Sequence, residues 1–171
     1  MKINPFLSLF PLMLFVLLQC SNPPEQKVFR EVEIETVPLE GNSVRALEAM
    51  PGAVGFAGSD GLFGSLDTRE LTLRTGVLEF QGSFPEFRAV GHTSSDFFVL
   101  SAGDPALLYK TGDQGQMELV YEEHGPGVFY DAMAFWDDQN GIAIGDAMDG
   151  CLGILITRDG GGTWKKTPCE E

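Results

Sequence analysis

Short apolar segments separated by polar turns occupy most of the chain. The clearest set lies near the C-terminus, at 128–135, 142–145, 151–157 and 163–167, with Gly, Asp and Asn in the turns between the segments. Apolar segments of this length, bounded by turn-forming residues, are typical of β-strands joined as hairpins. No window of eleven or more residues has a clear helical period of apolar positions. The pattern therefore predicts an all-β fold.

The strand pattern occurs three times, and two landmarks keep the same order in each copy. An Arg or Asp followed by Ala lies in short segments 43 residues apart, at 44–47, 87–90 and 130–133. A Ser or Thr two residues before Asp recurs every 46 residues, at 65–67, 111–113 and 157–159. Four strands in about 40–45 residues make one blade of a β-propeller.

These repeats predict a partial β-propeller of about three four-stranded antiparallel blades, at approximately 43–83, 84–125 and 126–171. Residues 28–37 alternate apolar and acidic side chains, and we expect them to form an outer strand. The alternative is an edge segment whose glutamates discourage pairing with other sheets. Residues 28–171 would then be an incomplete propeller, since propellers typically close with 4–8 blades. We expect the chain to be the front part of a larger propeller.

The N-terminus has the pattern of an export signal. Lys2 precedes an apolar run from Phe6 to Leu18, which is too short to span a bilayer. The end of this run, Leu17-Leu18-Gln19-Cys20-Ser21, resembles a bacterial lipoprotein box, in which the cysteine is lipidated and becomes the mature N-terminus. We therefore expect a lipoprotein signal peptide at 1–19, a lipidated Cys20 and a tether at 20–27. The alternative is an ordinary signal peptide cut near Gln19, which leaves Cys20 as a free thiol.

The third copy of the repeat contains a known turn motif. Its residues Thr157, Asp159, Gly161, Thr163 and Trp164 match the Asp-box, or bacterial neuraminidase repeat, Ser/Thr-x-Asp-x-Gly-x-Thr-Trp. From about Ser43 to its end the chain resembles Asp-box β-propellers related to sialidases and to photosystem II assembly-factor-like proteins. It looks most like lipid-anchored bacterial members of that group, which are often labelled oxidoreductase or glycosyl hydrolase. Such a resemblance implies a fold more safely than a reaction.

The motif has a structural role. We expect its aspartate to accept backbone N–H groups in a tight turn, its glycine to adopt a positive φ, and its tryptophan to pack on the hairpin. The Asp-box hairpin is expected to pair Thr157 with Thr163. The same register places Cys151 opposite Cys169, so we predict a disulfide between them, which an exported protein permits. The alternative is two free thiols.

Composition excludes one class of partner. The chain has 171 residues, of which 25 are acidic and 11 basic, with a formal net charge of −14. Binding to nucleic acid needs a basic face, so it is not expected. Apolar residues make up 43% of the chain, which is enough for a packed core.

Candidate binding residues lie at equivalent positions of the repeat. Arg45, Arg88 and Asp131 are expected on successive inner strands, where they would face the channel of a propeller. A sialidase needs three arginines for the substrate carboxylate, but the third equivalent position here is Asp131. The alternative is that these three residues form ion pairs between blades. Three aromatic residues near them are possible ligand platforms: Phe129, Tyr130 and Trp136.

No catalytic, cofactor or metal site is predicted. His92 and His124 lack metal-ligand spacing, and the segment 137–141 lacks the pattern of a calcium loop. The glycine-rich segment 55–61 does not have the spacing of a dinucleotide-binding loop. With so many acidic residues, pairs of carboxylates suited to a glycoside hydrolase, such as Asp131 with Asp146, are uninformative.

Taken together, these patterns predict an exported, lipid-anchored propeller module that binds a protein or a glycan and is not an enzyme. Its location would be the periplasmic or cell-surface side of a bacterial membrane. The alternatives are a sialidase-type glycoside hydrolase and an inactive fragment.

Overall fold

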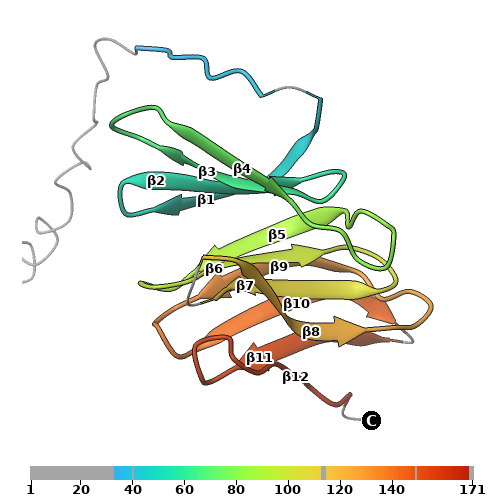
Figure 1. The fold of residues 1–171 in the computed structure, drawn as a ribbon. Helices are drawn as coiled ribbons and strands as arrows, with labels where there is room; N and C mark the ends of the chain where they lie inside the picture. Colours follow the sequence, from blue (N-terminus) through green and yellow to red (C-terminus); the bar gives the residue numbers. More distant parts are fainter. Residues whose placement is uncertain (1–32, 40, 113–114, 149, 170–171) are drawn as a thin grey trace, which may run out of the picture. The chain divides into compact units, whose positions relative to one another are not determined.

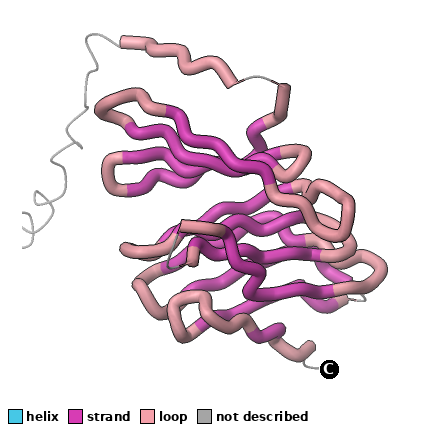
Figure 2. The backbone as a smooth tube through the Cα atoms, viewed as in Figure 1, coloured by secondary structure: helices cyan, strands magenta, loops and turns pink. Residues whose placement is uncertain are grey.

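The computed structural model describes residues 33–39, 41–112, 115–148 and 150–169 (Figure 1). The chain divides into two compact units, Met1–Thr36 and Val37–Glu171. Every strand of the described residues lies in the second unit, and no helix is present among those residues (Figure 2). None of the described segments is a helix that could cross a membrane.

The strands form three sheets of four. Blade 1 contains β1 (Val44–Met50), β2 (Ala53–Gly58), β3 (Leu62–Asp67) and β4 (Leu73–Val77). Blade 2 contains β5 (Phe87–His92), β6 (Phe97–Ser101), β7 (Ala106–Thr111) and β8 (Met117–Glu123). Blade 3 contains β9 (Tyr130–Phe135), β10 (Gly141–Met148), β11 (Cys151–Thr157) and β12 (Lys165–Lys166). Within each sheet, every strand pairs antiparallel with the next strand of the chain, so the predicted all-β class and its three four-stranded blades are confirmed.

The blades stack face against face. The inner strand of blade 2, β5, contacts both β1 and β9, the inner strands of the other two blades. Successive residues of a strand point to opposite faces of its sheet. In β6 the consecutive residues Phe98, Val99 and Leu100 are all 0% exposed, so blade 2 must be covered on both faces. We call the face toward the preceding blade the back face, and the face toward the following blade the forward face.

One apolar cluster fills each seam between blades. In the first seam, Ala57 of blade 1 packs with the back face of blade 2, which contributes Phe87, Val90, Val99, Leu107 and Tyr109. In the second seam, the forward face of blade 2 packs on the back face of blade 3. Blade 2 contributes Ala89, Phe98, Leu100, Ala106 and Leu108, and blade 3 contributes Val128, Tyr130, Met133, Ala143, Leu155 and Trp164.

Three strands of blade 3 differ in their bounds from the sequence-based expectation. The first, expected at 128–135, begins at Tyr130, and the second, expected at 142–145, is Gly141–Met148. The fourth, expected at 163–167, is only Lys165–Lys166. Thr163 is outside the ladder because its backbone N–H donates to the carboxylate of Asp159 at 2.9 Å. The turn therefore takes residues that the apolar pattern assigns to a strand.

The prediction of an outer strand at 28–37 is wrong for residues 33–37, the part of this segment that the structure describes. Residues 33–39 belong to no strand, and residues 28–32 lie outside the described residues. Each blade already has four strands from its own repeat, with β4 at the outer edge of blade 1 and β12 at that of blade 3. An alternating pattern gives a strand only where a sheet edge accepts it.

Cys151 and Cys169 form a disulfide, with their Cα atoms 5.6 Å apart. The register that suggested this bond is wrong by one residue, since Ile156 pairs with Lys165 and Thr157 does not pair with Thr163. The disulfide tolerates this shift because both cysteines lie at the ends of the same hairpin, beyond the two paired residues of β12.

The disulfide predicts the thiol chemistry of the folded chain. In a Cys20→Ser chain made under oxidising conditions, we expect no reactive thiol before reduction and two after it. Cys151→Ser with Cys169→Ser should lower the free energy of unfolding by about 2–4 kcal/mol, because the bond restricts the unfolded chain. Thiol titration and denaturant unfolding measure both effects, with Cys20→Ser alone as the control. Two reactive thiols without reduction would contradict the bond.

Candidate functional site

The inner strands carry the charged residues predicted to form a site. The Arg88 and Asp131 side chains, on β5 and β9, form an ion pair with 3.8 Å between Nη1 and Oδ1. Arg45 does not join them, because its Nη1 lies 2.8 Å from Oε2 of Glu86. The side chains of these residues are about one-third to one-half exposed, which leaves them accessible to a ligand.

Each arginine reaches across a seam to the blade that follows it. Glu86 and Phe129 both directly precede the inner strand of their blades. Glu86 forms an ion pair with Arg45, and the centre of the Phe129 ring lies 5.2 Å from the guanidinium carbon of Arg88. A cation over an aromatic face is attracted to it. The repeat therefore places a row of cross-seam contacts along the inner strands.

A shallow groove of about 240 Å³ runs across the three inner strands. It is lined by Ala46–Glu48 of β1, Arg88–Val90 of β5 and Asp131–Met133 of β9. Glu48 contacts Nδ1 of His92 at 2.7 Å across the first seam. The polar groups at this groove are thus two carboxylates and one guanidinium, each held by a neighbouring blade.

The three aromatic candidates differ in what they can contact. Trp136, just after β9, is 61% exposed, whereas Tyr130 is 2% exposed. The Tyr130 hydroxyl donates to Glu123 at 2.7 Å inside the second seam. Tyr130 is therefore part of the core, and its expected role as a ligand platform is wrong. Phe129 is half-buried and lies under Arg88.

A hydrogen-bond network around the carboxylate of Glu123 lies in the seam between blades 2 and 3, and the sequence did not suggest it. Glu123, at the end of β8, accepts the hydroxyls of Tyr121 and Tyr130, each at 2.7 Å, and pairs with Lys166 of β12. Burial acts to raise the pKa of Glu123, but these hydrogen bonds outweigh it and the pKa is lowered. Burial and Glu123 raise the pKa of both tyrosines. The network ties the outer strands of blades 2 and 3 together.

The Asp-box of blade 3 closes the turn between β11 and β12. Asp159 accepts the backbone N–H of Thr163 at 2.9 Å and its hydroxyl at 2.6 Å. The Thr157 hydroxyl donates to Asp159 at 2.8 Å and accepts the N–H of Gly161 at 2.9 Å. These hydrogen bonds, with that from the Thr163 hydroxyl first, lower the pKa of Asp159 to about 2.

The same turn also clamps blade 3 to blade 2. Gly161 has φ of 77°, and a Cβ there would lie 2.3 Å from the Phe98 ring. The Trp164 ring is 5.7 Å from Phe135, which stacks on Phe98 at 4.6 Å. Lys110 of blade 2 donates to the Gly160 carbonyl at 3.3 Å. The motif therefore stabilises the seam between blades 2 and 3.

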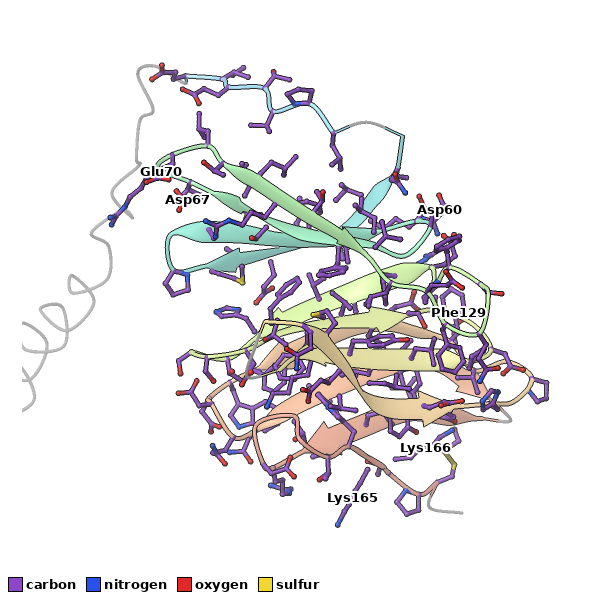
Figure 3. All side chains as sticks on the ribbon, viewed as in Figure 1. Asp60, Asp67, Glu70, Phe129, Lys165 and Lys166 are labelled. Carbon is purple, nitrogen blue, oxygen red and sulfur yellow. A yellow bond between two sulfur atoms is a disulfide. The ribbon has the colours of Figure 1, made fainter. Side chains whose placement is uncertain are left out.

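The other copies of the box are less complete. Asp67 in blade 1 accepts the N–H groups of Arg69 and Glu70, both at 2.8 Å, at the turn seen in Figure 3. Asp113 of the second copy and the expected lipidation site Cys20 lie outside the described residues. Within the described ranges, no group of three His, Cys, Asp or Glu side chains is arranged to hold a metal ion.

Comparison with known proteins identifies the fold. No protein-family model and no curated protein matches the chain. Among solved structures, the chain is similar to YCF48 in its structure bound to D1 peptide, with a TM-score of 0.57 and 16% identity over 73% of this chain and 40% of that chain. A chain of the structure of S. cerevisiae dbp5 bound to nup159, gle1, ip6 and adp gives a TM-score of 0.45 and 15% identity over 72% and 36%.

The first of these similarities, together with the three stacked meanders, places the chain among β-propeller proteins. The chain spans less than half the length of each of the two solved chains. The inner-strand groove is therefore the exposed surface of a partial propeller.

The Asp-box predicts a pH-dependent contribution to stability. The folded pKa of Asp159, about 2, is below its ordinary value, so its ionised form stabilises the fold above pH 4 and that contribution is lost as pH falls through about 2. Asp159→Asn should cost about 1 kcal/mol at pH 7, and the difference from the unchanged chain should shrink toward pH 2.

Thermal unfolding followed by circular dichroism between pH 2 and 7 measures this difference. Asp60→Asn, which changes an exposed carboxylate outside the box, is the control and should behave like the unchanged chain. An equal effect of Asp159→Asn at all pH values would contradict the assigned role.

Proposed function

We propose that the chain is a propeller-type binding module that holds a basic segment of a protein partner in the inner-strand groove. The observation that carries this proposal is the alignment of Glu48, Arg88 and Asp131 along one groove across three blades. Two accessible carboxylates favour a basic side chain of the partner, and the guanidinium between them favours a carboxylate or a main-chain carbonyl.

The charge of the whole chain supports a basic partner. A formal net charge of −14 attracts positively charged segments and speeds their encounter with the groove. The structure of YCF48 bound to D1 peptide is a structure of a different protein, but it motivates testing a peptide as the ligand here. Further blades would complete the ring around the groove and supply more of the contacts.

We also propose that the module is exported and anchored by lipid on Cys20. The support is the apolar run ending at Cys20 and the Cys151–Cys169 disulfide, which suits an oxidising compartment. Anchoring by one lipidated residue would leave the blades free to meet a partner at the membrane surface.

A sialidase-type glycoside hydrolase is the alternative function. It is favoured by one observation, which is that Arg45 and Arg88 occupy equivalent places on neighbouring inner strands. Each of these arginines is paired with a carboxylate, and the third equivalent position is Asp131. A binding module therefore accounts for the row of charges better than a site for a substrate carboxylate.

The groove predicts how peptide binding responds to charge removal. Twelve-residue peptides selected from a random library against the full chain should be enriched in Lys and Arg. Glu48→Gln with Asp131→Asn should weaken binding of a selected peptide at least tenfold, about 1.4 kcal/mol, because both acceptors for its cations are lost. Fluorescence anisotropy at two salt concentrations measures the affinity.

The matched control is Asp60→Asn with Glu70→Gln, which removes the same charge from exposed turns and should leave the affinity nearly unchanged. Equal weakening by both pairs would show that net charge alone, and not the groove, binds the peptide. Hydrolysis of a fluorogenic sialoside that Arg88→Ala abolishes would favour the alternative function.

The lipid anchor has a separate test. When the full chain is made in a bacterial host, we expect it to enter the detergent phase of a Triton X-114 partition, and Cys20→Ser to move it to the aqueous phase. Gln19→Ala, which restores a small residue before the cysteine, should keep it in the detergent phase. Mass spectrometry of the mature N-terminus would contradict lipidation if it showed an unmodified Cys20.

A further inference from the structure

A groove of about 350 Å³ lies in the first seam, at the outer end where blade 1 meets blade 2. Blade 1 contributes Met50, Phe63 and Arg74 to its lining, and blade 2 contributes Phe97 and Thr111. Met50, Phe63 and Phe97 are half-buried, so the groove has apolar walls that a ligand can reach. Because both walls belong to described residues of this chain, the groove does not depend on any further blade.

The two seams can be compared position by position, because the inner strands of the blades are equivalent. Gly55 of β2 and Phe98 of β6 each lie two residues before the partner of an alanine, Ala46 or Ala89, that is the third residue of its inner strand. Gly55 and Phe98 are therefore equivalent. The residues that pair outward from them are Ser65 and Arg74 in blade 1, and Lys110 and Glu118 in blade 2.

Large side chains fill this row in the second seam. The ring of Phe98 stacks on that of Phe135 at 4.6 Å, and the Trp164 ring lies 5.7 Å from Phe135. The Lys110 ammonium lies 5.8 Å from the centre of the Phe98 ring. Three rings and one long side chain thus occupy the outer end of the second seam.

The first seam has less bulk at the same place. Four positions carry a smaller or more polar residue than in the second seam: Gly55 for Phe98, Ser65 for Lys110, His92 for Phe135 and Met117 for Trp164. Phe97 takes part of the space, since a Cβ on Gly55 would lie 2.5 Å from its ring. The groove remains beside Phe97, and an aromatic group of a ligand would restore there the packing that the second seam has.

Arg74 determines the charge of the groove. It is the one charged residue in the lining, it is exposed, and it belongs to none of the ion pairs between described residues. An adjoining hollow contains His92 and Asp96, which contact Glu48 and Lys110. The chain is acidic overall, but charges act over only about 8 Å at physiological salt. A guanidinium binds a carboxylate through two parallel hydrogen bonds, so the groove favours an anion.

We propose that this groove binds a small aromatic carboxylate, with its ring between Met50, Phe63 and Phe97 and its carboxylate on Arg74. The volume of about 350 Å³ suits a small ligand, since pockets for such ligands measure about 300–1,000 Å³. The Thr111 hydroxyl accepts the backbone N–H of Phe97 at 2.9 Å, which holds the start of β6 at the groove. The site shares no lining residue with the inner-strand groove, so it is independent of the peptide ligand.

Indole-3-acetate is the probe, because its ring is that of Trp164 in the second seam. Ligand-observed NMR titration of the full chain should give a dissociation constant of about 1 mM or lower. Arg74→Gln should raise this constant at least fivefold and leave binding of the neutral indole-3-acetamide unchanged, because only the charge-assisted contact is lost. Arg69→Gln is the matched control, since it removes the same charge from an exposed turn and should change neither affinity.

A second variant tests the place of the ring. Ser65→Phe fills the groove from blade 1 and should remove binding of both compounds, whereas Ser65→Ala should keep it. Circular dichroism shows that each variant keeps the fold of the unchanged chain. The proposal is overturned if neither compound binds, if Arg69→Gln weakens binding as much as Arg74→Gln, or if folded Ser65→Phe still binds. Binding of acetyl-Gly-Gly-Trp at least tenfold more tightly than indole-3-acetate would overturn the assignment to a small molecule in favour of a peptide C-terminus.

Discussion

The constraint on which this structure depends is that each blade is a sheet with two apolar faces. A four-stranded meander with one face exposed would leave side chains such as Leu100 and Leu108 in water, so every blade needs a neighbour on each side. Blade 2 has both neighbours, and its inner three strands contain most of the described apolar residues that are 0% exposed. Blades 1 and 3 each have blade 2 as their one described neighbour, so each has one face that no described blade covers.

The seams are held differently at their inner and outer ends. At the inner end, half-exposed ion pairs such as Arg45 with Glu86 and Arg88 with Asp131 contribute little to stability, because water screens them. Farther out, the rings of Phe98, Phe135 and Trp164 pack against one another beside the Asp-box turn. Stability therefore comes from apolar packing, which leaves the inner-strand charges available for recognition.

Much of this arrangement could be predicted from the sequence, because the repeat is periodic. The spacings of 43 and 46 residues place the inner strands and the Asp-box turns, and with them Arg88 beside Asp131. The pairing of Thr157 with Thr163 was wrong because the Asp159 carboxylate takes the Thr163 N–H from the ladder. A strand pattern does not contain the hydrogen bonds of a side chain within a turn.

Contacts between residues far apart in the chain could not be predicted from the sequence. The Glu123 network brings together β8, β9 and β12. Nothing in the local pattern marks Tyr130 as buried or Lys166 as the partner of Glu123. The segment 33–37 alternates like a strand, yet the sheets already have their four strands. Whether an edge is free depends on the assembled blades and not on the segment itself.

The most direct test of the requirement that both faces of a blade be covered is amide hydrogen exchange of the full chain. Blade 2 packs on a neighbouring blade through each of its faces, so its strands β6 and β7 should exchange slowly. Among the described residues, β10 and β11 of blade 3 pack on a neighbouring blade through one face only, and the account predicts that they exchange faster than β6 and β7. Exchange of β10 and β11 that is as slow as that of β6 and β7 would contradict it.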